Sequence, residues 1–203
     1  MPRVGNAYFT AKRAFDLVAC LLLLPFVLPA LLLCAIAVAV DTRGPIVFSQ
    51  QRTGRHGRRF RMFKFRTMVR NAEELKEGLQ HLNILPPPDF KIIDDPRITR
   101  TGKILRKTSL DELPQIFNVL LGHMSLVGPR PTSFAPSTYS LWHTHRLEVP
   151  PGITGLWQVK GRNDTTFDER LRLDIRYIEN MSFVADLKIL SLTAAAVFKG
   201  SGA

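Results

Sequence analysis

The sequence predicts a mainly α-helical protein with a small β-hairpin element, an N-terminal re-entrant membrane helix and interfacial amphipathic helices. Three observations support this fold class. A stretch of 24 residues without a charge, Leu17 to Val40, lies near the N-terminus. Two extended segments with turn residues between them follow it, and the rest of the chain carries helical periodicity. With 203 residues, the chain has room for one modest soluble core and one membrane element.

The apolar stretch is long enough to cross a hydrocarbon core of ~30 Å. Pro25 and Pro29 interrupt it, and a proline inside a helix removes a hydrogen bond and clashes with the preceding turn. Both flanks are basic, and basic residues favour the cytoplasmic side. We therefore expect a helix that enters the membrane, breaks or bends sharply between Pro25 and Pro29 and returns. The alternatives are a kinked span and a secretory signal, although the stretch exceeds the ~7 to 15 residues of a signal peptide's apolar region.

This pattern divides the chain into a membrane anchor, residues 1–41, and a second region, residues 42–203. The net charge is +11, from 28 Lys and Arg against 17 Asp and Glu, which favours anionic partners such as phosphates, nucleic acid or acidic lipid. Cys20 and Cys34 both lie in the apolar stretch, so neither a disulfide framework nor a cysteine metal site is expected. No Walker, GxGxxG or HExxH motif is present.

The elements after the anchor follow from local patterns. Between Arg43 and Arg70 lie nine basic residues and no acid. The turn residues 53–57 separate two extended segments and predict a hairpin. The last predicted helix is apolar enough to lie on a bilayer surface. The predicted strands are Pro45–Gln50 and Arg59–Phe65, and the predicted helices are Asn71–Leu82, Asp111–Leu121, Phe167–Asn180 and Phe183–Lys199.

Two adjacent carboxylates, Asp111 and Glu112, are the strongest candidates for chemistry. Ser109 and Glu112 stand three apart, as in a capping box that opens a helix. A purely structural cap is one interpretation. The other starts from Pro114, which is tolerated in a first helical turn and so places Asp111 at the positive end of the helix. There a carboxylate stays ionised, faces a natural phosphate site and can attack phosphorus.

An attack of a carboxylate on a phosphate requires cations, usually Mg²⁺ with Arg or Lys. Arg130 lies in the stiff loop Gly128-Pro129-Arg130-Pro131 and suits a phosphate, although it also fits an ordinary exposed turn. Lys64 and Arg66 suit a second phosphate or, alternatively, a solvated strand face against lipid. Asp174 has Arg172 and Arg176 nearby, which favours a structural ion pair.

Six motifs occur in an order that resembles one family. They are Lys12–Asp16, Pro45–Gln50, Lys64–Met68, Thr108–Gln115, Met124–Pro131 and Pro151–Gly155. Together they resemble the bacterial sugar transferases, the monotopic polyprenyl-phosphate phosphoglycosyl transferases. The resemblance covers about Lys12 to Phe198, and the chain looks like the minimal catalytic form because it lacks the extra N-terminal membrane helices of longer relatives.

The resemblance implies a Mg²⁺-dependent ping-pong reaction, the first membrane step of polysaccharide or glycoconjugate assembly. Asp111 would attack the β-phosphate of a UDP-sugar donor, release UMP and pass the phosphosugar to undecaprenyl (polyprenyl) phosphate. Asp111 would also contact the metal, and Glu112 would serve as an acid/base or orienting group. The residues implied to contact phosphate, the metal shell or the nucleotide are Lys64, Arg106, Arg130, Arg162, Asn163 and Asp174.

The resemblance further implies that residues 42–203 form a catalytic domain on the cytoplasmic face of the inner membrane. It implies membrane lipid as a partner and no nucleic acid, and it is compatible with a homo-oligomer. The chain departs from the family's small members at the kink, where Leu28 precedes Pro29 in place of Ser and Pro25 is extra. His123 replaces an acid. Two other functions compete. One is a non-catalytic basic membrane-surface protein that binds nucleic acid or acidic lipid through residues 43–70. The other is a glycosyltransferase that releases UDP, but no DxD motif is evident.

Overall fold

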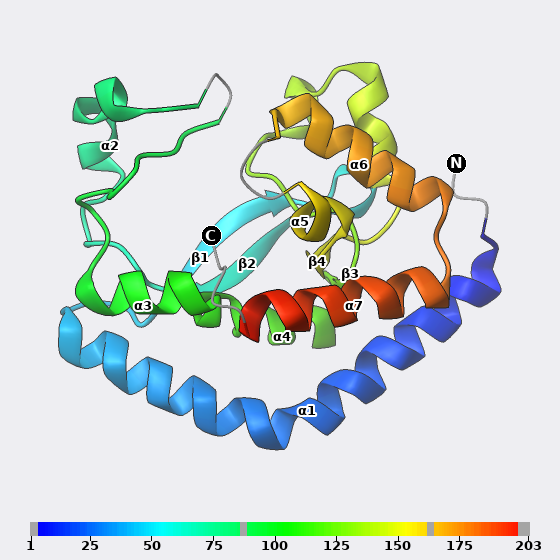
Figure 1. Ribbon diagram of the computed structural model, residues 1–203, viewed down its shortest axis with the longest axis horizontal. Coiled ribbons are helices and arrows are strands. Elements are labelled where there is room, and N and C mark those ends of the chain that lie inside the picture. Colours follow the sequence, from blue (N-terminus) through cyan, green and yellow to red (C-terminus); the bar gives the residue numbers. More distant parts are fainter. Residues whose placement is uncertain (1–3, 86–88, 162–164, 199–203) are drawn as a thin grey trace.

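The computed structural model describes residues 4–85, 89–161 and 165–198. The fold is mainly helical with a small antiparallel hairpin, as the sequence predicts. Helix α1, Asn6–Asp41, lies beneath the rest of the molecule, and the hairpin sits between α1 and the upper helices (Figure 1). The hairpin consists of β1, Val47–Thr53, and β2, Arg59–Phe65. The remaining elements are α2, Glu74–Gly78; α3, Arg100–Thr108; α4, Gln115–Leu120; β3, Ser125–Val127; β4, Gly152–Thr154; α5, Leu156–Lys160; α6, Phe167–Glu179; and α7, Phe183–Phe198.

Helix α1 continues through both prolines. It runs from Asn6 to Asp41 with Pro25 and Pro29 inside it, so the helix does not end where a break or sharp kink was predicted. The ribbon instead bends near its middle, in the part of the sequence that holds the two prolines (Figure 1). A proline kinks a helix rather than ending it when the flanking turns keep their hydrogen bonds. Both arms of α1 therefore rise from the bend toward the rest of the molecule (Figure 1).

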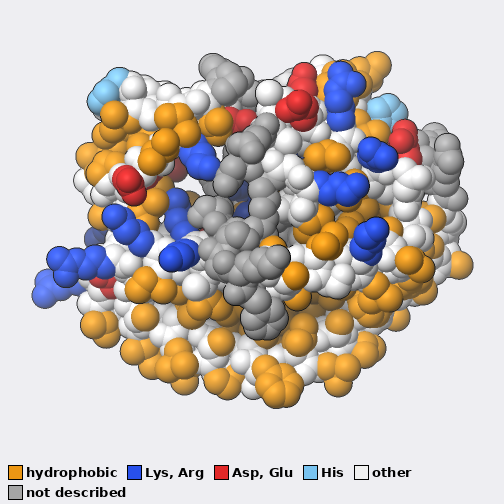
Figure 2. Space-filling model, viewed as in Figure 1, with side chains coloured by type: hydrophobic (Ala, Val, Ile, Leu, Met, Phe, Trp, Pro, Cys, Tyr) orange, Lys and Arg blue, Asp and Glu red, His pale blue; other side chains and the backbone are white. Residues whose placement is uncertain are grey.

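The two sides of α1 differ in exposure. Cys20, Cys34 and Val38 are buried against the rest of the protein. The other side exposes large apolar side chains: Val18, Leu21, Leu22, Leu23, Phe26, Leu28, Leu32, Leu33, Ile36 and Val40. They form an apolar band along the lower edge of the molecule (Figure 2). Helix α1 is long and apolar enough to cross a membrane. An apolar surface of this size is typical of a membrane contact.

The first arm of α1 is tied to the rest of the chain by polar contacts as well. Lys12 Nζ lies 2.6 Å from Asp186 Oδ2 at the start of α7. Arg13 donates to the carbonyl oxygens of Val119 and Leu120 at the end of α4. Asp16 accepts a hydrogen bond from the backbone N–H of Leu126 in β3, 3.2 Å away. The middle of α1 also joins a core with the hairpin and α4. The anchor is therefore part of the same packed structure.

The hairpin fixes which of its side chains share a face. Its register runs from Val47 opposite Phe65 to Thr53 opposite Arg59. Directly opposed residues of an antiparallel pair point to the same face. Gln50 is opposite Met62, Arg52 is opposite Phe60, and Lys64 is opposite Phe48. Gln50, Arg52 and Lys64 therefore lie on the same face of the hairpin.

A buried asparagine attaches the hairpin to α4. Asn118 is fully buried, its Oδ1 accepts from the N–H of Phe63 at 2.9 Å, and its Nδ2 donates to the carbonyl of Arg61 at 2.7 Å. These bonds satisfy the outer edge of β2, which has no strand partner on that side. Lys64 on β2 is thereby placed beside the turn that precedes α4.

Several predicted elements differ in detail. The helix expected over Asn71–Leu82 is the short α2 followed by a 3₁₀ turn, Gln80–Leu82. The helix expected from Asp111 is a 3₁₀ turn, Leu110–Glu112, followed by α4. The expected capping box is wrong: Ser109 has φ 58°, ends α3 and makes no capping bond. The two C-terminal helices are confirmed as α6 and α7. The parallel pair β3 and β4 was not predicted.

Replacing Asn118 with Leu should lower the free energy of unfolding by about 2 to 4 kcal/mol, because two backbone groups of β2 lose their partner. Thermal unfolding in detergent micelles measures the effect. The exposed Asn180, whose amide donates to Arg176 O, provides the control Asn180→Ala, with a change below about 1 kcal/mol. Equal losses in the two variants would contradict the role given to Asn118.

Candidate active site

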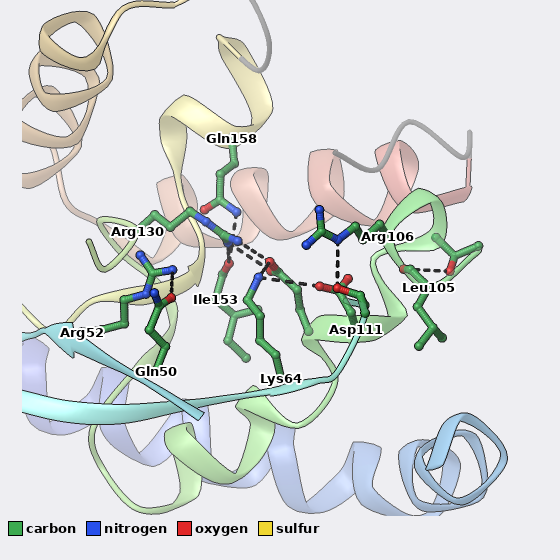
Figure 3. A network of polar contacts seen from close by, with 12 residues as sticks. Gln50, Arg52, Lys64, Leu105, Arg106, Asp111, Arg130, Ile153 and Gln158 are labelled. Carbon is green, nitrogen blue, oxygen red and sulfur yellow. Dashed lines mark hydrogen bonds and ion pairs between the residues drawn. The ribbon is translucent and has the colours of Figure 1, made fainter. Parts of the chain in front are cut away.

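Four segments bring charged side chains together above the hairpin. The turn Leu110–Glu112 supplies Asp111 and Glu112, and β2 supplies Lys64. Arg106 comes from the last turn of α3, and Arg130 from the loop after β3. Figure 3 shows these side chains converging. Of the eight catalytic and substrate-binding residues predicted from the sequence, five meet in this cluster.

Glu112 is the centre of the cluster. Its Oε1 lies 2.7 Å from Lys64 Nζ and also accepts from Arg130 Nη2, while its Oε2 accepts from Arg130 Nη1 at 3.0 Å. Burial opposes the ionisation of Glu112, but Arg130 and Lys64 outweigh burial and lower its pKa. Glu112 therefore stays a carboxylate with both oxygens engaged. This environment favours its predicted orienting role over proton transfer.

Asp111 has a different environment from its neighbour. It is 7% exposed, and Lys64 Nζ lies 3.7 Å from its Oδ2. In the described parts of the chain, no hydrogen bond to its carboxylate is found. Burial raises the pKa of Asp111, with Glu112 adding to the rise and Lys64 opposing it. A helix N-terminus would have lowered the pKa of Asp111. No such lowering is expected here, because a 3₁₀ turn stands where the long helix was predicted to begin. A buried carboxylate without hydrogen bonds is basic and free to attack an electrophile.

The loop that carries Arg130 is held from behind by a buried ion pair. Arg146, which is 4% exposed, donates to the backbone carbonyl of Arg130 and pairs with Asp174 Oδ2 at 2.5 Å. The partner of Asp174 is thus Arg146 and not the sequence neighbours Arg172 or Arg176. Burial raises the pKa of Asp174 to about 6, against the opposing effect of Arg146. Asp174 is 1% exposed and touches the cluster only through Arg146; its predicted contact with substrate stays a prediction.

Arg106 depends on a close approach of α3 to the chain after β2. A Cβ atom on Gly102 would lie 2.2 Å from the carbonyl oxygen of Thr67, so only glycine allows this packing. Arg106 Nε then donates to Thr67 Oγ1 at 2.9 Å. Burial lowers the pKa of Arg106, while Asp111 opposes that shift. Arg106 is consequently held on the Asp111 side of the cluster.

Sequence patterns were less informative for several other residues. Arg66, considered with Lys64 for a second phosphate, instead donates to the carbonyl and hydroxyl oxygens of Thr42 after the end of α1. Arg162 and Asn163 lie outside the described residues. Gln50 and Arg52 belong to the cluster and were missed (Figure 3). The signal that could have identified them is the alternation of side chains along the predicted strands, which places Gln50 and Arg52 on the same face of the hairpin as Lys64.

The residues present fit a magnesium ion that is shared with substrate. Among residues 4–85, 89–161 and 165–198, no group of three His, Cys, Asp or Glu side chains could hold a metal. Asp111 alone offers unengaged carboxylate oxygens in the cluster, because Lys64 and Arg130 occupy those of Glu112. Mg²⁺ is commonly bound through one or two carboxylates, substrate phosphates and waters. The donor set therefore suits such an ion better than a cage made of protein alone.

The chain is similar to known sugar transferases over most of its length. The family model described as bacterial sugar transferase matches residues 7–200. The galactosyl transferase CpsE of Streptococcus agalactiae is 45% identical over 97% of this chain and 44% of that protein. The undecaprenyl-phosphate galactose phosphotransferase of Salmonella typhimurium is 46% identical over 95% of this chain and 41% of that protein. The uncharacterized sugar transferase EpsL of Bacillus subtilis is 42% identical over 94% of this chain and 89% of that protein. The chain thus spans less than half of the first two relatives and most of the third.

The pair Asp174 and Arg146 makes stability depend on pH. The pKa of Asp174 is about 6 in the folded protein, above its ordinary value of 3.8, so the folded state binds this proton more tightly than the unfolded state. The stabilisation is complete below about pH 4 and is lost as the pH rises through 6. The melting temperature of wild type should therefore fall relative to that of Asp174→Asn between pH 4 and pH 7.

Melting curves of both proteins in detergent from pH 4 to pH 8 measure this difference. Asp168→Asn, which removes an exposed carboxylate from the same helix, controls for the change in net charge. Melting temperatures of wild type and Asp174→Asn that stay a constant distance apart would contradict the assignment.

Proposed function

The chain belongs to the bacterial sugar transferase family, and we propose that it transfers a sugar phosphate from a UDP-sugar to polyprenyl phosphate with release of UMP. The observation that carries this proposal is the contrast between Asp111 and Glu112. Asp111 is buried and basic, and its carboxylate has no hydrogen bond from the residues that the structure describes, whereas Lys64 and Arg130 engage both oxygens of Glu112. Two adjacent carboxylates with such different environments suit a nucleophile and an orienting group.

The transfer takes two substitutions at the same phosphorus. In the first, an Asp111 oxygen forms a bond to the β-phosphorus while the bond from that phosphorus to the oxygen bridging the two phosphates breaks. UMP leaves with the bonding electrons, and the phosphosugar stays on Asp111. In the second, a phosphate oxygen of polyprenyl phosphate attacks the same phosphorus. The lipid diphosphosugar forms, and the Asp111 carboxylate is released.

The charges of the cluster suit a diphosphate. Four cationic side chains, Arg52, Lys64, Arg106 and Arg130, surround two carboxylates (Figure 3). The excess of positive charge favours an anion and lowers the repulsion between Asp111 and a phosphate. In the proposed enzyme, Asp111 and the donor's phosphates would hold Mg²⁺, which would supply further neutralisation of the charge that develops on the phosphate oxygens.

We propose that α1 holds the catalytic part on the cytoplasmic face of the inner membrane as a re-entrant helix. The bend in α1 supports this, because both arms rise toward the same side of the molecule (Figure 1). The exposed apolar side chains of α1 would contact acyl chains. Val184 and Leu187 of α7 and Leu121 after α4 are also exposed and would lie at the interface. Such a position brings the active site to the headgroup level, where the phosphate of a polyprenyl acceptor resides.

Asp111→Asn should abolish UMP release, because an amide is not a competent nucleophile at phosphorus. We expect a loss of at least about a thousandfold in turnover with little change in melting temperature. The assay follows nucleotide release by detergent-purified protein with Mg²⁺, a panel of UDP-sugars and undecaprenyl phosphate. UDP in place of UMP would indicate transfer of the sugar alone, and full turnover by Asp111→Asn would remove Asp111 as nucleophile.

Removal of divalent metal should stop UMP release by the wild-type protein, and added Mg²⁺ should restore it. The same treatment should leave the melting temperature of the substrate-free protein unchanged, because Asp111 alone is too small a donor set for tight binding. Chelation with EDTA followed by both measurements tests this. A large loss of thermal stability on chelation would point to a structural metal site instead.

A further inference from the structure

Arg52 is a cation of the cluster that so far has only a share in its positive charge and no contact of its own with a substrate. It lies on β1, on the same face of the hairpin as Lys64 and Gln50. Its Nη2 donates to Gln50 Oε1 at 2.5 Å, and its Nε is buried with no partner among the described residues. Burial and the nearby Arg130 lower the pKa of Arg52 to about 10, with Glu112 opposing them. The guanidinium of Arg52 therefore lies near that of Arg130, and among the described residues it forms no ion pair with a carboxylate.

A neighbouring arginine shows what a structural role looks like in this hairpin. Arg59 donates to Thr53 Oγ1 and to the carbonyl oxygens of Gln51, Ser133 and Phe134, so its donors hold the hairpin to the following loop. Within the described part of the chain, Arg52 makes no such bond to another segment. Arg52 is half-buried, and its buried Nε–H is left without a partner, which is costly unless an anion satisfies it when substrate is bound. Arg59 thus has a structural role in the hairpin, whereas Arg52 is available to bind a ligand.

The position of Arg52 indicates which anion it meets. Arg52 and Asp111 lie at opposite ends of the cluster, with Lys64 and Arg130 between them (Figure 3). Substitution at phosphorus places the attacking and leaving oxygens roughly in line. With Asp111 as nucleophile, the leaving phosphate must lie beyond the reacting phosphorus, on the side away from Asp111. In the second half-reaction the acceptor attacks from that same side.

We propose that Arg52, oriented by Gln50, binds this in-line phosphate: that of the departing UMP in the first half-reaction and that of polyprenyl phosphate in the second. The inference rests on the proposed function and names the residue that serves both phosphates. Arg130 lies between this subsite and the reacting phosphate, so it can contact both. UMP and polyprenyl phosphate then compete for one guanidinium, although the nucleoside and the polyprenyl chain differ entirely.

The test compares Arg52→Gln with Arg61→Gln, which removes the same charge from the opposite, exposed face of the hairpin. Steady-state assays give the KM for polyprenyl phosphate and the inhibition constant for UMP. Arg52→Gln should raise both by about tenfold to a hundredfold, the usual effect of losing charge-assisted hydrogen bonds. Arg61→Gln should change each less than about threefold, because exposed charges act weakly at a distance.

A binding measurement separates phosphate contact from general damage. Calorimetry on Asp111→Asn protein, with and without Arg52→Gln, measures the affinities for UMP and for uridine. The UMP affinity should fall while any uridine affinity stays the same. Arg52→Lys, which keeps a charge but loses the planar fork, should give a smaller loss and covers the case in which Arg52→Gln fails to fold.

The outcomes distinguish this inference from the proposed function. If wild type releases UMP and Arg52→Gln behaves like Arg61→Gln, the subsite is wrong and the transferase stands. A rise in only one of the two constants would also overturn the shared subsite. Equal losses for UMP and uridine would assign Arg52 to the nucleoside or to folding. If wild type releases no UMP from any sugar donor, the proposed function fails, and the inference fails with it.

Discussion

The double ion pair of Glu112 is the constraint on which the rest of the site depends. Lys64 comes from the hairpin, Arg130 from the loop after β3, and Glu112 from the turn before α4, so one carboxylate fixes three segments that are distant in sequence. Without that carboxylate the two cations would repel each other in a poorly solvated place. The surrounding structure supports the arrangement from two sides. Asn118 holds the edge of β2 to α4, and Arg146 holds the backbone of Arg130. The cluster is thus preorganised by contacts that do not themselves face a substrate.

Asp111 and Glu112 show how adjacent residues of the same chemistry acquire different properties. Glu112 gains two cations and its pKa falls, while burial dominates at Asp111 and its pKa rises. The difference arises from the 3₁₀ turn, which points the two side chains toward different neighbours. A regular helix beginning at Asp111 would have provided free N–H groups to the carboxylate and lowered its basicity. The irregular turn therefore matters chemically, because it leaves the carboxylate of Asp111 more basic than a carboxylate at a helix cap would be.

Local signals in the sequence were sufficient for much of the fold and for the centre of the site. The uncharged stretch identified α1, alternation and turn residues identified the hairpin, and periodicity identified α6 and α7. The motifs identified Asp111, Glu112, Lys64, Arg106 and Arg130. The failures share a physical reason. The partner of Asp174, the parallel pair β3 and β4, and the place of Arg52 depend on contacts between segments far apart in sequence, which spacing does not encode. The capping box predicted for Ser109 was wrong for a related reason. A serine three residues before a glutamate can equally end the preceding helix in a left-handed conformation.

Helix α1 is packed into the rest of the protein and is not a separate segment. Arg13 caps the end of α4, Asp16 supports β3, and Cys20 lies fully buried beneath the hairpin. A chain cut after Asp41 would lose these supports and would expose the apolar undersides of the hairpin and α4. Trimming the N-terminus to make the protein easier to handle would consequently remove part of the support beneath the candidate site. The first forty residues and the cluster around Glu112 must then fold together, so a chain whose α1 is not yet in place has no complete site.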